Sequence, residues 1–457
     1  MSGWLTSVLS SDGVYTARVC IGSPPIPFEL IVDTGSFVTA LPCTWCDRCG
    51  MHGVGQKYDP GGSATAGFPD CRNGTGPAPR ASTHARRQHC KEFLTSYAES
   101  SEYRGVLISE VGYLARLQDG IVKAAPMKVG CITHETGILH DQRADGILGL
   151  ARGAPSVALL STSPLKTVLK GKHHHRAISL CLSDSGGRLW LGDAKNASQV
   201  DKRGAIVLPI IHTSGSQGYA LRLQALRVQR IKHEPLGEQI LDRASGSAGN
   251  SSSSYTTLEN PAHYNHVGGT DLMQTTAIET SKEHRRHGSE IVCVIDTGST
   301  SLRLPTPLYA ALCGLLRQQL SELGSLEFGG HDPPCAYLTE EALAKLPTLT
   351  LHFVDAKQTP LILAPQQLML HRPASHSSII RSTVRYMRHR GAPSRRMCAA
   401  LDDSGSGKAF LGAAVLRNTE VVFMDSSVAF VQDTSCGSAE SSLLALNSIH
   451  SLGCPVV

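Results

Sequence analysis

The sequence predicts a mostly β protein built from two similar lobes, and two observations support this fold class. The first is the dominance of short runs rich in Val, Ile and Leu, bounded by Gly, Pro, Ser and Asp, as expected for strands. The second is a long-range internal repeat. Helical periodicity is expected in Leu159–Leu169 and Leu308–Leu320. The expected strands are Val14–Ile21, Phe28–Val32, Ile178–Leu182, Arg188–Leu191, Ala220–Val228, Ile291–Ile295, Thr348–Phe353, Ala409–Leu411 and Val421–Phe423.

Each copy of the repeat is an apolar run that leads into Asp-Thr-Gly-Ser and is followed much later by two apolar residues and a glycine. The motif begins at Asp33 in the first copy and at Asp296 in the second. The later glycine, Gly149 or Gly412, follows its Asp at the same distance along the chain in both copies. This agreement predicts two homologous lobes that face each other.

The repeat and the composition of the intervening segments predict the domain boundaries. The expected lobes are an N-terminal lobe over residues 12–195 and a C-terminal lobe over residues 196–436, followed by a tail over 437–457. The expected insertions are a Cys-rich segment at 43–90 and polar segments at 242–288 and 371–397.

The bulk composition is that of an ordinary globular protein. A length of 457 residues suggests two or three domains, and an apolar content of 41% is enough for a sizeable core. The formal charge of +5 is modest, so we expect solvated surface and a monomer that binds no nucleic acid. The sequence has no apolar run of about eighteen residues, so no membrane-spanning helix is expected.

The fourteen cysteines predict an oxidising compartment, because so many thiols are unusual in a reducing cytosol. They divide into even numbers before and after the midpoint, so we expect disulfides that close within each half. The sequons at Asn73, Asn196 and Asn250 are compatible with a secretory route. Met1–Ser11 is not a signal peptide, so we expect the chain to be incomplete there and any membrane anchor to lie outside it.

The two Asp-Thr-Gly-Ser motifs predict the chemistry. Two neighbouring carboxylates cannot both ionise readily, so they share one proton and can activate a water molecule against a peptide carbonyl. This reaction needs no metal and no cofactor. The glycines let the two loops approach, the threonines can bond across to the opposite loop, and the serines can bond the carboxylates. The predicted catalytic residues are Asp33 and Asp296, supported by Thr34, Gly35, Ser36, Thr297, Gly298 and Ser299.

These residues make the chain resemble the pepsin family of aspartic proteases along nearly its whole length. Gly13–Pro25 is similar to the first strand and turn of that family, and Ser96–Glu99 followed by Gly105 is similar to its flap hairpin. The resemblance implies a bilobal fold with a central cleft, an aspartic-type endopeptidase activity and a substrate-binding role for Tyr97 of the flap.

A narrower resemblance is to the plasmepsin V and aspartyl protease five branch of apicomplexan parasites. It rests on the segments Leu41–His52, Ser96–Ser100 and Gly130–Glu135. The branch implies cleavage of secretory proteins at Arg-x-Leu export motifs in the endoplasmic reticulum or Golgi. It also implies that Glu99 and Glu135 bind the substrate arginine, because a guanidinium favours carboxylate partners; the alternative is that both are ordinary surface glutamates.

Other readings remain open at this point. Phe37 replaces the small polar residue that the family has after Asp-Thr-Gly-Ser, which leaves room for a catalytically silent peptide-binding homologue. A vacuolar or digestive protease of broad apolar specificity is a further alternative. Cys43, Cys46, Cys49 and His52 have a spacing that can ligate zinc, but we expect disulfides here instead. His173–His175 is expected to be an exposed loop.

Overall fold

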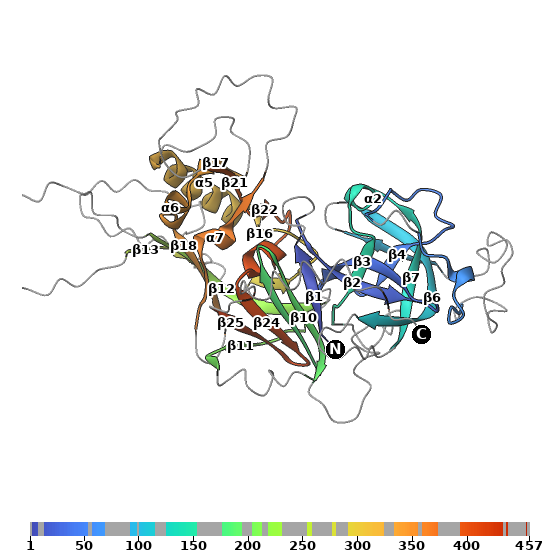
Figure 1. The fold of residues 1–457 in the computed structure, drawn as a ribbon. Coiled ribbons are helices and arrows are strands. Elements are labelled where there is room, and N and C mark those ends of the chain that lie inside the picture. Colours follow the sequence, from blue (N-terminus) through green and yellow to red (C-terminus); the bar gives the residue numbers. More distant parts are fainter. Residues whose placement is uncertain are drawn as a thin grey trace, which may run out of the picture. The chain divides into compact units, whose positions relative to one another are not determined.

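A computed structural model of the chain confirms the mostly β fold class (Figure 1). Every expected strand coincides with an observed one, and Leu308–Leu320 lies within α5 (Thr306–Glu322). The expected helix at Leu159–Leu169 lies outside the described residues. The structure describes residues 2–7, 13–53, 57–68, 92–97, 100–114, 125–152, 176–193, 203–212, 218–230, 254–257, 277–279, 291–323, 333–354, 359–372, 394–432, 436 and 454.

The chain divides into two compact units whose boundaries differ from those of the expected lobes. Unit 1 comprises Met1–Leu221, Cys293–Leu302 and Phe410–Val457, and unit 2 comprises Arg222–Val292 and Arg303–Ala409. The loop that carries Asp296 therefore belongs to unit 1, together with Asp33. Both predicted catalytic residues lie in the same compact unit.

Unit 1 is built around a thirteen-stranded sheet with the order β11-β25-β24-β9-β10-β1-β2-β3-β8-β4-β7-β6-β5. Within this order β9 lies between β24 and β10, and Figure 1 labels β25, β24, β10 and β1 in this part of the sheet. Its strands are β1 (Ser2–Ser7), β2 (Tyr15–Ile21), β3 (Ile26–Asp33), β4 (Ala40–Pro42), β5 (Glu92–Ser96), β6 (Glu102–Leu114), β7 (Ala125–Glu135), β8 (Gly146–Gly149), β9 (Arg176–Ser183), β10 (Gly186–Asp193), β11 (Ile206–Pro209), β24 (Thr419–Met424) and β25 (Ser427–Gln432). Its short helices are η1 (Pro60–Gly62), α2 (Ile138–Asp141) and η7 (Ala413–Leu416).

In unit 2, β12 (Tyr219–Arg230) pairs with β18 (Thr348–Phe353), β13 (Ser254–Thr257) and β14 (Ala277–Glu279). The first three residues of β12, Tyr219–Leu221, are the end of the first segment of unit 1. The helix α5 buries one face, which includes Leu312, Leu316 and Leu320, at the spacing expected of an amphipathic helix. Three further strands have residues in both units: β15 (Ile291–Ile295), β16 (Leu302–Leu304) and β23 (Ala409–Leu411). The remaining elements of unit 2 are β17 (Cys335–Leu338), α6 (Glu340–Ala344), β19 (Leu361–Leu363), α7 (Pro365–Leu368), β20 (Met369–His371), β21 (Arg395–Ala399) and β22 (Leu401–Asp403).

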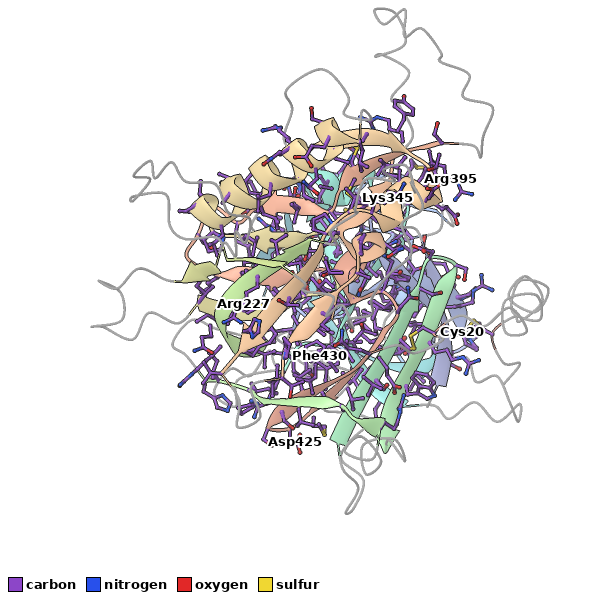
Figure 2. All side chains as sticks on the ribbon, turned by 90° about the vertical axis from the view of Figure 1, so that its left-hand side faces the viewer. Cys20, Arg227, Lys345, Arg395, Asp425 and Phe430 are labelled. Atoms are coloured by element: carbon purple, nitrogen blue, oxygen red, sulfur yellow. A yellow bond between two sulfur atoms is a disulfide. The ribbon has the colours of Figure 1, made fainter. Side chains whose placement is uncertain are left out.

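Five disulfides occur among the described cysteines. Cys43–Cys131, Cys46–Cys49 and Cys335–Cys398 each close within one half of the chain, as expected. Cys20–Cys454 and Cys181–Cys436 do not, so the expectation of closure within each half is wrong for these two. The reason is that the last strands, β24 and β25, join the same sheet as β9, which returns the end of the chain to unit 1. Figure 2 labels Cys20 and the fully buried Phe430 of this unit.

Two strands of unit 1, β5 and β6, form the hairpin that the sequence predicts as the flap. β5 pairs antiparallel with β6, with Thr95 opposite Tyr103 and Ser96 opposite Glu102. The turn begins at Tyr97, whose N–H donates to Ser101 O at 2.8 Å, and Ser100 adopts a left-handed backbone conformation. β6 continues along β7, so the hairpin is anchored in the main sheet.

Among the described helices, none is long and apolar enough to cross a membrane.

Candidate active site

The first Asp-Thr-Gly-Ser loop begins where a buried strand ends. β3 is an apolar strand whose last four residues are all buried, and Asp33 is its final residue at 3% exposure. β3 runs parallel to β8 with Asp33 opposite Gly149, and Leu150 N–H donates to Asp33 O at 2.7 Å. Because a parallel neighbour holds the strand end, the position of Asp33 is fixed by the main chain.

The second loop is held in a similar way. It follows β15, and Asp296 N–H donates to Leu411 O at 3.0 Å. The equal spacing in the repeat has a physical basis, because each later glycine packs tightly against the loop of its own copy. A Cβ atom on Gly149 would lie 2.7 Å from Val38 O, and one on Gly412 would lie 2.4 Å from Ser301 O, so neither position tolerates a side chain.

Thr34 and Thr297 interlock the two loops, as the sequence predicts. Each threonine hydroxyl accepts the N–H of the other threonine at 3.1 Å. Each hydroxyl also donates to the strand before the opposite loop, Thr34 to Ile295 O at 2.9 Å and Thr297 to Val32 O at 2.6 Å. Both threonines are buried. This reciprocal set of bonds fixes one carboxylate relative to the other.

Gly35 and Gly298 allow the two carboxylates to approach. A Cβ on Gly35 would lie 2.6 Å from Asp296 Oδ1 and 3.2 Å from Asp33 Oδ1, so both carboxylates lie against this glycine. A Cβ on Gly298 would lie 2.3 Å from Asp33 Cγ. Any other residue at either position would push into the carboxylates. The Gly in each motif is therefore a steric requirement of the pair.

The hydrogen bonds around the two carboxylates differ. Asp33 Oδ1 accepts the N–H groups of Gly35 at 2.7 Å and Ser36 at 3.1 Å, and its Oδ2 accepts a short bond from the Ser36 hydroxyl. Asp296 Oδ1 accepts the Gly298 N–H at 3.1 Å. The Ser299 hydroxyl donates to the main-chain oxygen of Asp296, at 3.0 Å. Bonds of this kind favour the ionised form, so the charge is better accommodated on Asp33.

The pKa values of the two carboxyls follow from this arrangement. Desolvation raises the pKa of Asp296 to about 8, and the charge of Asp33 and a hydrogen bond to Asp33 act in the same direction. Desolvation also raises the pKa of Asp33, but its bonds to Ser36, Gly35 and Asp296 oppose that effect. The pKa of each carboxyl is thus raised, and the hydrogen bonds oppose this effect at Asp33 more extensively than at Asp296.

The flap tyrosine reaches the first loop. Tyr97 Oη lies 2.9 Å from Ser36 Oγ, so the flap hairpin contacts the serine that bonds Asp33. Phe37, the departure noted in the sequence, packs with Tyr97 against the core cluster that contains Phe93 and Tyr103. It thus fills space beside the loop, and the hydrogen bonds of Asp33 described above are intact.

Sequence reasoning did not single out Tyr103. This side chain is 1% exposed, and its ring centroid lies 5.9 Å from that of Tyr97 and 5.8 Å from that of Phe93. The available signal was the alternation of exposed and buried residues along β6, where Glu102 and Arg104 are exposed and Tyr103 faces inward.

The two predicted arginine-binding residues have different outcomes. Glu99 lies outside the described residues. Glu135 lies at the end of β7 with a side chain only 1% exposed, and its Oε2 lies 3.0 Å from His52 Nε2 and accepts the Gly50 N–H at 3.2 Å. The carboxylate of Glu135 is therefore already engaged within the protein.

His52 lies between a main-chain oxygen and a carboxylate. Its Nδ1 lies 3.1 Å from Gln142 O, and its Nε2 faces Glu135. Burial lowers the pKa of His52, but the hydrogen bond and the charge of Glu135 outweigh it and raise the pKa overall. His52 thus joins the segment after Cys49 to β7. The disulfides expected in this cluster are confirmed by Cys43–Cys131 and Cys46–Cys49, whereas Cys71, Cys90 and His173–His175 lie outside the described residues.

Part of the chain is similar to known proteins. Residues 15–193 match the family model described as xylanase inhibitor N-terminal. The chain is 30% identical to aspartic protease 5 of Toxoplasma gondii over 198 residues, which are 40% of this chain and 20% of that protein. It is 30% identical to plasmepsin V of Plasmodium falciparum over 185 residues, 39% of this chain and 29% of that protein.

A plant protein is also similar. The chain is 29% identical to aspartic proteinase nepenthesin-1 of Nepenthes gracilis over 156 residues, 34% of each chain. The matched region thus spans between a fifth and about a third of these relatives. The range of the family-model match, residues 15–193, includes the Asp33 loop, the Cys43–His52 segment and the flap hairpin. The chain is therefore similar, over part of its length, to pepsin-like aspartic proteases that include aspartic protease 5 and plasmepsin V.

Proposed function

We propose that this chain is an aspartic endopeptidase that hydrolyses peptide bonds with Asp33 and Asp296. The observation that carries the proposal is the pair of interlocked loops, which brings two carboxylates against Gly35 and lets them share a proton. Two carboxyls with different pKa values are the arrangement needed for general acid and base work on one substrate.

The hydrogen bonds support a division of roles between the two aspartates. Asp33, which accepts three donors, is the ionised base that removes a proton from a bound water molecule. Asp296 holds its proton at neutral pH and donates a hydrogen bond to the oxygen of the peptide carbonyl. The water oxygen bonds to the carbonyl carbon as the proton of Asp296 passes to the carbonyl oxygen, so a neutral gem-diol forms. The C–N bond then breaks as the proton held by Asp33 passes to the leaving nitrogen, and Asp296 takes back a proton from the gem-diol.

The proposed substrates are secretory proteins with an arginine at the third position before the cleaved bond and a leucine directly before it. Support comes from the resemblance in Leu41–His52 and in the flap. Because His52 and Gly50 occupy the Glu135 carboxylate, Glu99 is the stronger candidate for binding the arginine. Five disulfides support an oxidising compartment, so we place the enzyme in the lumen of the endoplasmic reticulum or Golgi.

A peptide library tests the proposal. The chain is produced under oxidising conditions, incubated with the library, and compared with Asp33→Asn by mass spectrometry of the products. We expect cleavage after Arg-x-Leu by the wild type and none by the variant. Binding without cleavage by the wild type contradicts an enzyme, and cleavage spread over apolar sites contradicts the export motif while leaving the protease assignment in place.

The arginine pocket needs its own comparison. Glu99→Gln should weaken the cleavage of Arg-containing peptides much more than that of matched Lys or neutral peptides, because a guanidinium loses a charged partner. Glu135→Gln serves as the comparison variant, since its carboxylate is already bonded to His52. An equal loss of cleavage for the Arg, Lys and neutral peptides would contradict the assignment of Glu99 to arginine binding.

A further inference from the structure

Tyr103 carries a hydroxyl whose environment is unusual for a core residue. The side chain is 1% exposed and belongs to the core cluster with Phe93, yet no described residue forms a hydrogen bond of good geometry with its hydroxyl, although the Tyr97 and Thr95 side chains lie near enough to affect its pKa. A buried hydroxyl without a partner destabilises a protein by about 1–3 kcal/mol. Phenylalanine would pack equally well without that penalty, so the hydroxyl calls for a functional explanation.

Its neighbours point to the active site. Tyr103 lies opposite Thr95 across the flap hairpin, and its ring contacts that of Tyr97. Burial raises the pKa of Tyr103 to about 12, and the charge of Asp33 acts in the same direction. Hydrogen bonding by the Tyr97 and Thr95 side chains lowers this pKa. The hydroxyl is therefore close to Tyr97 and within the field of the catalytic carboxylate.

The direction of the bonds between Tyr97 and Asp33 is fixed by proton count. The Ser36 hydroxyl donates its one proton to Asp33 Oδ2, so in the 2.9 Å contact with Tyr97 it acts as the acceptor. Tyr97 is thus the donor, and its oxygen keeps lone pairs that can accept a further bond. The group positioned to donate that bond is the hydroxyl of Tyr103.

We propose that Tyr103 is a positioning residue: its hydroxyl donates to Tyr97 Oη when a peptide closes the flap hairpin, and so completes a chain from Tyr103 through Tyr97 and Ser36 to Asp33. The proposal rests on the proposed protease function. Successive donors polarise one another, so the completed chain strengthens the bond to Asp33 and holds the negative charge there. The titratable groups that act on Tyr103 are Asp33 and Tyr97.

The test compares Tyr103→Phe with a matched control, Tyr15→Phe. Tyr15 is also 1% exposed, but its hydroxyl donates to Ser183 O at 2.7 Å. We expect Tyr103→Phe to keep or raise the Tm, to lower kcat about 2- to 10-fold with little change in KM, and to move the acidic limb of the kcat/KM profile to higher pH. Tyr15→Phe should lower the Tm and leave the pH profile unchanged.

A background variant shows whether Tyr103 acts through Tyr97. In Tyr97→Phe, the further change Tyr103→Phe should have no effect on kcat, because the chain is already broken. An equal kcat loss with and without Tyr97 overturns the proposal. A Tm loss like that of Tyr15→Phe with an unchanged pH profile also overturns it, because Tyr103 is then purely structural.

A readout without turnover separates this proposal from the proposed function. Binding of a peptide with a hydroxyethylene group in place of the cleaved bond is measured by calorimetry. We expect the wild type to bind it and Tyr103→Phe to bind it about 2- to 10-fold more weakly. If the wild type neither cleaves peptides nor binds this one, the proposed function fails. If the wild type does both and Tyr103→Phe matches it, only the role of Tyr103 fails.

Discussion

At the scale of single residues, the unequal surroundings of Asp33 and Asp296 matter most. Three donors reach Asp33, whereas desolvation, the Asp33 charge and a hydrogen bond to Asp33 raise the pKa of Asp296 to about 8. The sequence predicts a shared proton from the repeated motif alone, but it does not predict on which carboxyl the proton resides. Both copies of the motif have the same residues, so the sequence cannot distinguish their hydrogen bonds. In the structure, the Ser36 hydroxyl donates to the carboxylate of Asp33, whereas the Ser299 hydroxyl donates to the main-chain oxygen of Asp296.

Asp296→Asn should stabilise the fold at neutral pH, because the amide mimics the protonated carboxyl. The folded pKa of Asp296, about 8, lies above its usual 3.8, so ionising this group opposes folding and its effect grows as pH rises from about 4 to 8. The free energy of unfolding of the variant should exceed that of the wild type by on the order of 2–4 kcal/mol at pH 8. Urea denaturation at several pH values measures it; a difference that does not change with pH contradicts the shifted pKa.

At the scale of elements, the strands position the site and the loops hold it together. β3 ends at Asp33 beside β8, and the Thr34 and Thr297 hydroxyls join the two loops. The apolar runs predict β3 and β15 correctly, because a buried strand has to be continuous and apolar. The sequence does not predict the contact between Glu135 and His52. This contact joins segments more than eighty residues apart, and no local pattern indicates it.

Removing the interlock should weaken both the fold and the activity. Thr34→Val keeps the shape of the side chain but leaves buried N–H and C=O partners unpaired, so we expect a loss of about 1–3 kcal/mol in unfolding free energy. Thr34→Val with Thr297→Val should lose less than the two single losses added together, because the hydroxyls bond each other's loops. The control is Thr350→Val, whose hydroxyl donates to Arg227 O at 3.2 Å. Additive losses would show that the two threonines act independently.

At the scale of the whole molecule, the last strands of the chain belong to the same sheet as the first ones. β24 and β25 join the sheet of β9 and β10, and two disulfides tie the C-terminal segment to Cys20 and Cys181. The repeat predicts two related halves, but it does not predict that the last strands cross back into the first unit. Cysteine counts cannot distinguish pairing within a half from pairing between halves, because both give even numbers.

The long-range disulfides should contribute most to stability. Replacing Cys181 and Cys436 with Ser should lower the unfolding free energy by about 2–5 kcal/mol, because this bridge restricts a long stretch of unfolded chain. The control pair, Cys46 and Cys49, is only three residues apart and restricts little. Thermal unfolding of both double variants provides the comparison. A larger loss for the control would contradict the argument from loop length.

The central claim is that Asp33 and Asp296 work as one unit, and the most direct test is kcat/KM for peptide cleavage by Asp33→Asn, Asp296→Asn and the double variant. Each single variant should lose roughly 10²–10⁴-fold, and the double variant should lose no more than the worse of the two, because either change already destroys the shared proton. Asp296→Asn should remain folded, as argued above. Losses that multiply in the double variant, or a single variant that keeps most of its activity, would contradict a catalytic pair.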